Sequence, residues 1–336
     1  MSRRITRLED LARLAGVSTA TVSRALNDSP AVTPETKRHV WKIAREHNYR
    51  FRRYMPSGPI GAEATIVVVI TRPQGRPYRL SDPFILELVA GIGEAARERG
   101  CDFLVSHVAP ATYEDLSTLM STSRADGIIF LGQSSLFPEF NRLAGEDNRF
   151  VVWGAQLPDQ SYCSVGSDNF RGGKRATAHL ARLGRRRIVF LGDIEAPEAM
   201  QRYSGYAEAL AEANIALEPA LVVPAHFEVE FAEAAVDSLI ARGVAFDGIV
   251  AASDLIALGA IRSLLHAGRR VPEDVSVIGY DDISFARYSH PALSTISQDT
   301  GKAGRLLVSK LLSSGREEIR SERLPTDLIV RESCGG

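Results

Sequence analysis

The sequence predicts an α/β protein with a three-helix head at its N-terminus and a body of two doubly wound parallel-sheet subdomains. Three observations support this prediction. Residues 1–48 contain three amphipathic helix patterns separated by turn signals. From residue 64 onward, short apolar, β-branched segments alternate with helix patterns of roughly 10 to 15 residues, as in parallel sheets. The body runs to about 270 residues, which is more than one domain usually holds.

The segment from Thr6 to Asn27 predicts two short helices joined by a tight turn. Thr6 can cap the first helix, and Glu9 completes a capping box. The inward face of this helix consists of Leu8, Leu11, Ala12 and Ala15. Gly16 suits the turn, because glycine tolerates a left-handed conformation. Ser18 can cap the second helix, whose inward residues are Val22, Ala25 and Leu26.

The outward surface of the second helix indicates DNA binding. Short side chains at its start let the backbone approach the bases, and Arg24 can reach a guanine edge or a phosphate. Thr19, Ala20 and Arg24 are expected to read bases. Ser18, Thr21 and Ser23 are expected nearer the phosphates. An ordinary helical hairpin is the alternative, but the caps, the turn glycine and the polar outer face together favour DNA binding.

The charge distribution supports a DNA-binding head. The whole chain of 336 residues has a net charge of only −1. Residues 1–54 nevertheless hold 12 Lys or Arg against 5 Asp or Glu, whereas the rest holds 28 against 36. This asymmetry is typical of a phosphate-contacting domain joined to a regulatory domain. Thr33 and Pro34 open a third helix, and its apolar positions distinguish it from a solvated basic tail: Val40, Trp41, Ile43 and Ala44.

Composition excludes several other classes. No run of 18 apolar residues would span a membrane, and the N-terminus lacks the apolar run of a signal peptide. Cys101, Cys163 and Cys334 are odd in number and far apart, so we expect free thiols in a reducing cytoplasm. No zinc-ligand spacing, nucleophile elbow or phosphate-binding glycine loop occurs, so we expect no metal, no cofactor and no enzymatic activity.

The body is expected to begin after a linker at residues 51–62, which is rich in Pro, Gly and Arg. The strands are predicted at 64–71, 102–106, 128–131, 150–153, 188–192, 221–224, 248–252 and 275–280. The helices are predicted at 84–99, 113–123, 171–183, 202–214, 229–242 and 254–267.

Several segments, spread over nearly the whole chain, carry a family resemblance. They are LEDLARLAGVSTATVSRALN and HNY in the head, and DPFILELVAGIGEAARERG, DGIIFLG, SVGSDNFRGG, HLARLGRRRIVFLGD, RYSGYAEALAEANI, DLIALGAIRSLLHAGRRVPEDVSVIGYDD and PALSTISQD in the body. Together they resemble the LacI family of transcriptional regulators. The resemblance implies a helix-turn-helix head, a hinge that folds on operator DNA, and a core like that of periplasmic sugar-binding proteins. It also implies a homodimer on a palindromic operator and a small effector, most often a sugar, in the cleft between the core subdomains.

The resemblance and the element pattern together give the expected domains. These are a DNA-binding head (1–50), a hinge (51–62) and an effector-binding core (63–334). Within the core, the N-subdomain is expected at about 63–164 and 291–317, and the C-subdomain at about 165–290 and 318–334. The complete set of expected DNA contacts is Thr6, Ser18, Thr19, Ala20, Thr21, Ser23, Arg24, Asn27, Arg50, Arg52, Arg53 and Met55.

Parallel sheets bind ligands beyond the carboxyl ends of their strands, so the loops there are the expected effector site. The candidates are Asp82, Phe84, Trp153, Arg202, Phe227, Ser253, Asp281 and Gln298. Aromatic faces suit the C–H surface of a mono- or disaccharide, and carboxylates and arginine suit its hydroxyls. The resemblance implies that Arg202 faces the ligand, and Asp281 is the next candidate.

Some interpretations stay open. Trp153 could be a core aromatic. His226 and Phe227 could lie in the cleft wall or on the protein surface. Asp254 is interpreted as a helix cap, and Asp168-Asn169 as shaping a crossover turn. The effector could be an inducer or a corepressor, and a solute-binding protein without DNA function is the alternative for the whole chain.

The chain also departs from the family pattern. Gly154-Ala155 stands where many members carry an acidic residue, and Ser253 stands where Asn is common. In the hinge, Phe51 replaces a proline, and residues 54–58 replace a helical turn. Pro and Gly disfavour so short a helix. Family members usually end this turn with a Leu wedged into the minor groove, and Met55 is the candidate for that role here. With such a hinge, the head is expected to carry more of the sequence discrimination.

Overall fold

The structure is a computed structural model that describes residues 8–26, 29, 31–47, 64–71, 81–106, 108–123, 125–133, 136–226, 228–313 and 320–335. The chain forms two compact units, Met1–Ile60 and Gly61–Gly336. In the described ranges, each helix is too short or too polar to cross a bilayer.

The first unit is a three-helix head made of α1 (Leu8–Ala15), α2 (Thr19–Leu26) and α3 (Pro34–Glu46). The amide N–H of Thr21 donates to Ser18 Oγ (3.0 Å), which confirms the predicted cap of α2. Gly16 has a φ of +65°, as its place in the tight turn requires. The buried core is formed by Leu11, Ala12, Ala15, Val22, Ala25, Leu26, Val32, Val40 and Ala44, and the predicted inward residue Leu8 is only half-buried against it.

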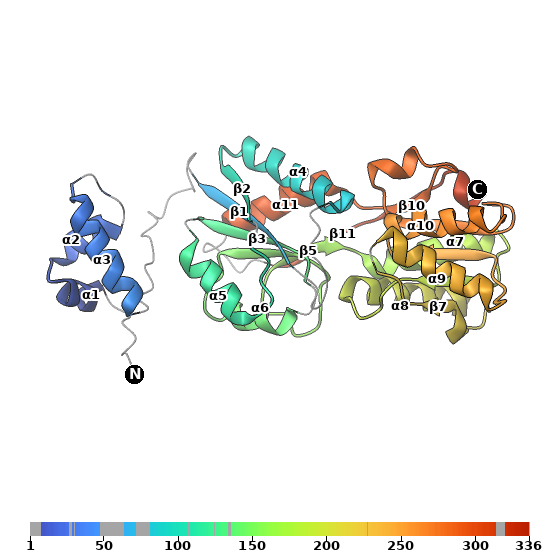
Figure 1. Ribbon diagram of the computed structural model, residues 1–336, viewed down its shortest axis with the longest axis horizontal. Coiled ribbons are helices and arrows are strands. Elements are labelled where there is room, and N and C mark those ends of the chain that lie inside the picture. Colours follow the sequence, from blue (N-terminus) through green and yellow to red (C-terminus); the bar gives the residue numbers. More distant parts are fainter. Residues whose placement is uncertain are drawn as a thin grey trace. The chain divides into compact units, whose positions relative to one another are not determined.

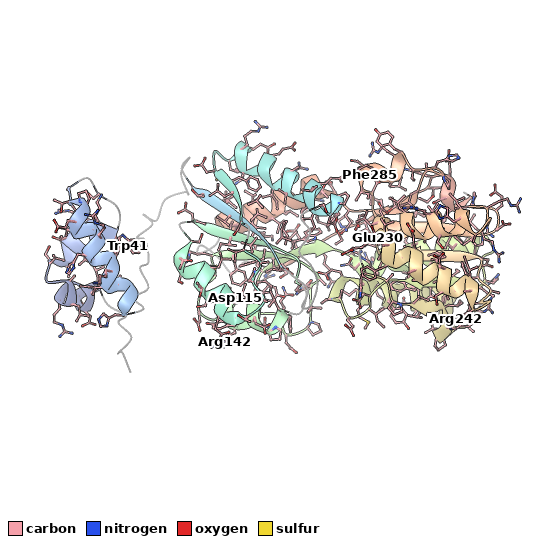
Figure 2. The ribbon with its side chains drawn as sticks, in the orientation of Figure 1. Trp41, Asp115, Arg142, Glu230, Arg242 and Phe285 are labelled. Atoms are coloured by element: carbon pink, nitrogen blue, oxygen red, sulfur yellow. The ribbon has the colours of Figure 1, made fainter. Side chains whose placement is uncertain are left out.

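The third helix has one large apolar side chain that is exposed to solvent. Its start is as expected, since the amide N–H of Thr36 donates to Thr33 Oγ1 (3.3 Å). Trp41, one of the apolar positions expected in this helix, is labelled in Figure 2. Its side chain is exposed, at 39 %. Val40 and Ala44 already fill the inward face, so the neighbouring position along the helix points outward.

The second unit contains two six-stranded sheets. The first sheet has the order β11-β5-β4-β3-β1-β2, with all its pairings parallel. Its strands are β1 (Thr65–Ile70), β2 (Asp102–Ser106), β3 (Gly127–Leu131), β4 (Phe150–Trp153), β5 (Ser164–Ser167) and β11 (Glu322–Leu324). One face is covered by α4 (Pro83–Glu98) and α11 (Thr300–Ser313), the other by α5 (Tyr113–Thr122) and α6 (Phe137–Ala144) (Figure 1). Covering both faces explains the continuous apolar runs of the central strands.

The second sheet has the order β12-β10-β9-β8-β6-β7. Its strands are β6 (Ile188–Leu191), β7 (Val222–Val223), β8 (Gly248–Ala251), β9 (Ser276–Asp281), β10 (Ser294–Ser297) and β12 (Asp327–Ile329). Its helices are α7 (Asn169–Arg182), α8 (Pro197–Glu212), α9 (Val229–Ala241) and α10 (Asp254–His266), with 3₁₀ turns η1 (Pro219–Leu221), η2 (Ser284–Arg287) and η3 (Glu332–Cys334). Only the β10–β12 pair is antiparallel among the described strand pairs.

The chain passes between the sheets at points that differ from the predicted subdomain boundaries. β5 extends the first sheet to Ser167, past the expected boundary at 164. β10 pairs with β9 in the second sheet although residues 291–317 were assigned to the N-subdomain. β11 pairs with β5 in the first sheet although 318–334 were assigned to the C-subdomain. These strands are short and partly polar, so backbone pairing rather than hydropathy determines their sheet.

Two helices of the second unit approach each other closely through glycines. A Cβ atom on Gly173 of α7 would collide with the backbone of Arg202 on α8. A Cβ on Gly205 of α8 would collide with the carbonyl of Phe170 and lie 2.6 Å from the amide nitrogen of Lys174. The absence of these side chains lets α7 and α8 pack backbone to backbone, which sets the spacing of the residues at their N-terminal ends.

Candidate functional site

Most residues of α2 that the sequence predicted to point outward are exposed to solvent in the structure. Thr19, Ala20 and Arg24 are exposed. Ser18 Oγ accepts from Thr21 N–H and lies 2.8 Å from Thr21 Oγ1, so these two hydroxyls also stabilise the start of the helix. Ser23 is half-buried. The other predicted DNA contacts lie outside the described residues: Thr6, Asn27, Arg50, Arg52, Arg53 and Met55.

A buried polar network in the second unit is centred on Arg202 of α8. Its Nε donates to Asn169 Oδ1 (2.8 Å), and its Nη1 donates to the carbonyl of Ala252. The guanidinium carbon lies 3.7 Å from the centre of the Tyr280 ring, and Nη1 lies 3.9 Å from Asp281 Oδ1. Arg202 is only 6 % exposed, so this charge is held by groups from three elements rather than by water.

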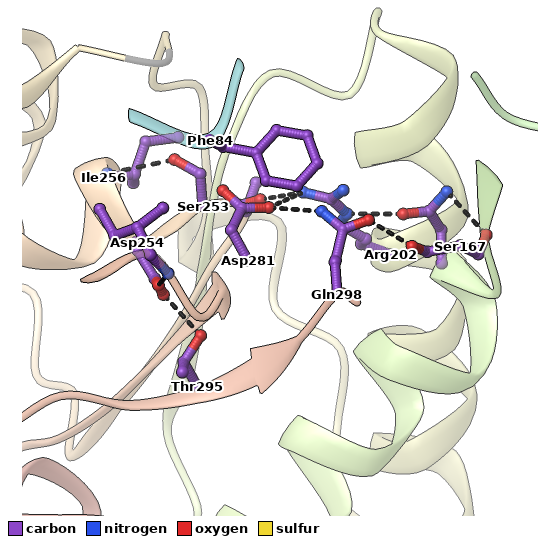
Figure 3. Close-up of polar contacts among 12 residues, drawn as sticks. Phe84, Ser167, Arg202, Ser253, Asp254, Ile256, Asp281, Thr295 and Gln298 are labelled. Carbon is purple, nitrogen blue, oxygen red and sulfur yellow. Dashed lines mark hydrogen bonds and ion pairs between the residues drawn. The ribbon is translucent and has the colours of Figure 1, made fainter. Parts of the chain in front are cut away.

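Gln298 extends the network from one sheet to the other. It follows β10, and its Nε2 donates to Asp281 Oδ1 (2.6 Å) at the carboxyl end of β9. Its Oε1 accepts from the hydroxyl of Ser167 at the carboxyl end of β5 in the first sheet (Figure 3). One amide therefore connects side chains of both sheets, and a ligand that displaced either bond would change that connection.

The aromatic residues predicted for this site come together as well. Phe84, in the first turn of α4, and Trp153, at the end of β4, have ring centres 5.9 Å apart and an interplanar angle of 43°. Asp82 caps α4, since its Oδ1 accepts from the N–H of Phe84 (2.9 Å) and of Ile85 (3.4 Å). The structure gives Trp153 a buried position beside Phe84, which fits both interpretations left open by the sequence.

The interpretation of Asp254 as a helix cap is wrong. Ser253 caps α10, because its Oγ accepts from Ile256 N–H (3.3 Å). Asp254 is fully buried and accepts from Ile283 N–H (2.9 Å) and from the Thr295 hydroxyl (2.5 Å), so it ties α10 to neighbouring segments. The cap falls one residue earlier because a serine with extended backbone already precedes the first helical residue.

Asp168 and Asn169 both shape the turn between β5 and α7, as interpreted. Asp168 Oδ1 accepts from Arg171 N–H (3.1 Å) and caps α7, and Asn169 Nδ2 donates to the carbonyl of Ser167 (3.2 Å). Asn169 also belongs to the buried network, because its Oδ1 accepts from Arg202 Nε. No local pattern indicated this, because the two residues are 33 positions apart and meet only through the close packing of α7 and α8.

The remaining candidates lie elsewhere or outside the described residues. Phe227 is not among the described residues. His226 Nδ1 lies 3.3 Å from Asp193 Oδ2, and its ring centre lies 5.1 Å from that of Phe231. In the part of the chain that the structure describes, no group of His, Cys, Asp or Glu is arranged to hold a metal ion.

The missing acidic residue after β4 has a structural explanation. A Cβ on Gly154 would lie 2.9 Å from both Cβ and Oε1 of Gln133, which follows β3. Gln133 thus occupies the space that a side chain at position 154 would need. No pattern in the sequence distinguishes Gln133, because a single glutamine after a strand has no characteristic spacing.

Burial changes the protonation of the acidic groups in the network. Burial raises the pKa of Asp281 to about 7, although the Arg202 guanidinium opposes this and the Asp82 carboxylate adds to it. Burial also raises the pKa of Asp254, with a further contribution from the charge of Asp281. Asp281 has a φ of +120°, a conformation that non-glycine residues rarely adopt. The backbone is therefore held in an unfavourable geometry that directs this carboxylate into the network.

Asp281→Asn is expected to raise the free energy of unfolding, and the gain should grow with pH. Because the pKa of Asp281 is raised, the folded state binds this proton more tightly than the unfolded state between about pH 4 and pH 7. Stability due to this group therefore falls as pH rises through that window and is constant above it. Asparagine does not ionise, so the difference in free energy of unfolding between the variant and the wild type should increase up to about pH 7 and then level off. Urea unfolding from pH 4.5 to 8 measures this.

Asp274→Asn is the matched control with the opposite sign. Hydrogen bonds from Arg270 lower the pKa of Asp274 to about 2. This carboxylate stabilises the folded state above about pH 4, so its loss should lower stability throughout the window. Equal pH profiles for the two variants would contradict the assignment of a raised pKa to Asp281.

Comparisons with known proteins agree with both parts of the chain. Residues 7–50 match the model of bacterial regulatory proteins of the lacI family, and residues 177–334 match a periplasmic binding protein-like domain. The chain is 34 % identical to the HTH-type transcriptional regulator CelR of Thermobifida fusca, over 98 % of this chain and 99 % of that protein. It is 32 % identical to the ribose operon repressor of Haemophilus influenzae, over 97 % of this chain and 98 % of that protein.

Solved structures show the same fold. A CelR–cellobiose complex has a TM-score of 0.70 at 32 % identity and covers 97 % of this chain and 99 % of its own. The lac repressor dimer bound to operator, at 24 % identity, has a TM-score of 0.71 over 99 % of both chains and supports the fold alone. The named relatives are transcriptional regulators. With its helix-turn-helix head, its two-sheet core and this full-length similarity, the chain belongs to the LacI family of DNA-binding transcriptional regulators.

Proposed function

We propose that this protein is a repressor whose affinity for operator DNA is controlled by a neutral mono- or disaccharide bound at the Arg202–Asp281–Gln298 network. The observation that carries the proposal is the bridge made by Gln298 between Ser167 of one sheet and Asp281 of the other. A ligand whose hydroxyls compete for these groups would favour one relative placement of the sheets over another. In this proposal the head comprises residues 1–50, the hinge 51–62 and the effector core 63–334.

The choice of a sugar is supported by the types of residue present. An arginine, an aspartate and an amide offer donors and acceptors for hydroxyl groups, and Phe84 and Trp153 offer apolar ring surface. The relative at 32 % identity in the CelR structure is in complex with cellobiose, which makes cellobiose the first ligand to test.

A homodimer on a palindromic operator is part of the proposal. Large apolar side chains are exposed on α4 and on the segment at η2, including Leu86, Phe285 and Tyr288. Figure 2 labels Phe285. The N–H of Ser284 donates to Glu87 Oε1 (2.9 Å), so α4 and η2 are in contact there. A second copy that covers this surface would bring two heads to two half-sites. Sedimentation velocity should give twice the 36.6 kDa chain mass.

Titration of operator binding tests the control by effector. Operator DNA selected with the purified full-length protein would be labelled, and its affinity measured by fluorescence anisotropy with and without cellobiose, glucose or ribose. Coupling free energies of about 1–3 kcal/mol predict a change in Kd of about 5-fold to 150-fold for the cognate sugar. A sugar that raises the melting temperature but leaves operator affinity unchanged would refute the linkage.

The same assay separates a repressor from a solute-binding protein without DNA function. Binding through the basic head should weaken steeply as salt is raised, because phosphate contacts release counterions. Absence of any sequence preference between 50 and 200 mM salt would favour the solute-binding alternative. On this proposal the protein acts in the cytoplasm, where operator DNA is found.

Arg24→Ala is expected to relax operator preference. The exposed Arg24 side chain lies on the outward surface of α2, and a side-chain pair with a base edge contributes about 1–3 kcal/mol of discrimination. Competition between selected and scrambled DNA should show the specificity ratio falling by about 10-fold or more. Arg38→Ala removes an exposed arginine of α3 and serves as the control. Full operator preference in the Arg24 variant would overturn its role in reading bases.

A further inference from the structure

We propose that the second unit carries a docking surface for an acidic protein segment that also bears apolar side chains, at the amino ends of strands β6 to β9. Neither operator DNA nor the effector uses this edge in the proposed function. Because the strands are parallel, their amino ends lie at the edge of the sheet opposite to Asp281, which ends β9. A partner and an effector can therefore bind at the same time.

Four chain segments meet at this edge, because β7, β6, β8 and β9 are neighbouring parallel strands. They are residues 182–187 before β6, 213–221 before β7, 242–247 before β8 and 267–275 before β9. Together they contain seven arginines, no lysine and four carboxylates, whereas residues 55–336 as a whole hold 28 basic and 36 acidic residues. The edge is thus basic on an acidic body, and such a local reversal of sign steers an acidic partner to it.

Arginine side chains also tie the four segments to one another. Arg185 Nε donates to Ser276 Oγ (2.9 Å), which joins the segment before β6 to the start of β9. Arg187 Nε donates to the carbonyl of Ala245 before β8 (2.7 Å), and its Nη2 pairs with Glu218 before β7 (2.9 Å). A partner therefore meets a preformed surface and loses little affinity to ordering it.

Most carboxylates at the edge are already engaged. Asp247 accepts from the backbone N–H of Arg186 (2.9 Å), and Asp274 Oδ1 accepts from Arg270 Nη2 (2.7 Å). Of the four carboxylates in these described segments, only Glu273 makes no side-chain hydrogen bond or ion pair. Little negative charge is therefore left to neutralise the remaining arginines.

Four arginines of the edge are exposed and form no ion pair with a carboxylate in the part of the chain that the structure describes. They are Arg182, Arg186, Arg242 and Arg269, of which Figure 2 labels Arg242. A cation at a helix C-terminus is favourable in itself, which accounts for Arg182 and Arg242. Arg186 and Arg269 lie beyond the last turns of α7 and α10, so helix ends do not account for them. Their charge is available to an anionic partner.

Exposed leucines among these arginines indicate which kind of anion fits. Leu183 is next to Arg182 and is 39 % exposed. Leu217 is 45 % exposed and precedes Glu218, which pairs with Arg187. Covering such side chains is favourable against apolar groups. The sugar-phosphate backbone of a nucleic acid is polar and charged, whereas a protein segment offers carboxylates and apolar side chains together.

The test measures binding of labelled probes to the full-length protein by fluorescence anisotropy. The probes are a peptide of mixed glutamates and leucines, the same peptide with serine in place of leucine, and a DNA duplex of scrambled sequence. Wild type should bind the leucine peptide at least about threefold more tightly than the serine peptide, because the leucines bury apolar surface. Arg182→Glu/Arg242→Glu/Arg269→Glu should weaken binding of the leucine peptide by about tenfold or more at about 50 mM salt. This loss should shrink at about 500 mM salt, because ions screen exposed charges.

The matched control reverses three exposed arginines of α4, α7 and α11, in the variant Arg97→Glu/Arg171→Glu/Arg305→Glu. It has the same net charge as the first variant and leaves the head and the edge unchanged, so it should bind the leucine peptide as wild type does. Arg182→Gln/Arg242→Gln/Arg269→Gln removes the charge without reversing it and should weaken the peptide by about threefold. This milder variant replaces the first one if thermal melting shows that charge reversal unfolds the protein.

Three results would overturn the proposal. The first is a wild-type protein that does not bind the leucine peptide. The second is an equal loss in both charge-reversed variants, which would assign the effect to net charge alone. The third is a lower melting temperature of the edge variants with unchanged peptide binding, because the arginines would then act only on the helix ends. If the edge variants weaken scrambled DNA as much as the peptide, the edge binds nucleic acid and the choice of a protein partner is wrong.

Discussion

Gly205→Ala is expected to destabilise the second unit by about 3 kcal/mol, the upper range for overpacking a well-packed interface. The added Cβ would meet the carbonyl of Phe170 and the amide nitrogen of Lys174, which are backbone atoms and cannot rotate away. α7 and α8 would have to separate, and Asn169 and Arg202 would move apart with them. Chemical denaturation of the full chain measures the loss of stability.

Gly93→Ala is the matched control for that substitution. Gly93 also lies within a helix, α4, but its added Cβ would meet only the Phe103 ring, with Cε1 nearest at 3.5 Å, which is ordinary contact. Alanine should then stabilise the helix by up to about 1 kcal/mol. Similar effects of the two substitutions would show that the close packing of α7 and α8 is not what requires glycine at position 205.

Arg202→Met is expected to abolish control by the effector. Methionine fills much of the same space, but it cannot donate to Asn169 or to the Ala252 carbonyl, and it leaves Asp281 without its cation. Losing a hydrogen bond from a charged donor to a ligand hydroxyl costs about 1.5–3 kcal/mol, so the affinity for the cognate sugar should fall by at least about 10-fold. Operator binding without sugar should persist, since the head folds around its own core.

Two controls assign this effect to ligand contact. Arg171→Met changes an arginine of α7 whose side chain is 78 % exposed, and it should leave the response to sugar intact. The double variant Arg202→Met/Asp281→Asn removes both charges of the pair. Its free energy of unfolding should therefore be higher than that of Arg202→Met, whereas the response of operator affinity to sugar should stay lost. Operator titrations that show a normal sugar response in Arg202→Met would refute the central role of this arginine.

The sequence alone predicted the elements whose signals are local. The caps at Ser18 and Thr33 and the inward residues of α1 and α2 follow from side chains within one or two turns of each other. The central strands were recognisable because a strand covered on both faces must be apolar throughout. Arg202, Asp281 and Gln298 were reached by the rule that ligands bind at the carboxyl ends of parallel strands. The structure gathers all three in one network.

Other features could not be predicted in this way. α6 and α11 and the strands β5, β10, β11 and β12 were absent from the predicted elements, and the strands are only three or four residues long. α8 begins at Pro197, five residues before the predicted start. A short polar strand is held by backbone pairing with its neighbours, and no periodicity in its own residues reports that pairing.

The sequence by itself thus determined the class of protein: a basic helix-turn-helix head, an α/β core of two sheets, and an arginine and an aspartate near the carboxyl ends of its strands. Only the tertiary structure decided which side chains act together. The close approach at Gly173 and Gly205 brings Asn169 to Arg202, the packing of Gln133 explains why position 154 is glycine, and Gln298 joins the two sheets. The physical reason is that caps and apolar periodicity are encoded over a few neighbouring residues, whereas a site is formed by groups that only the packing of distant helices and strands brings within hydrogen-bonding distance.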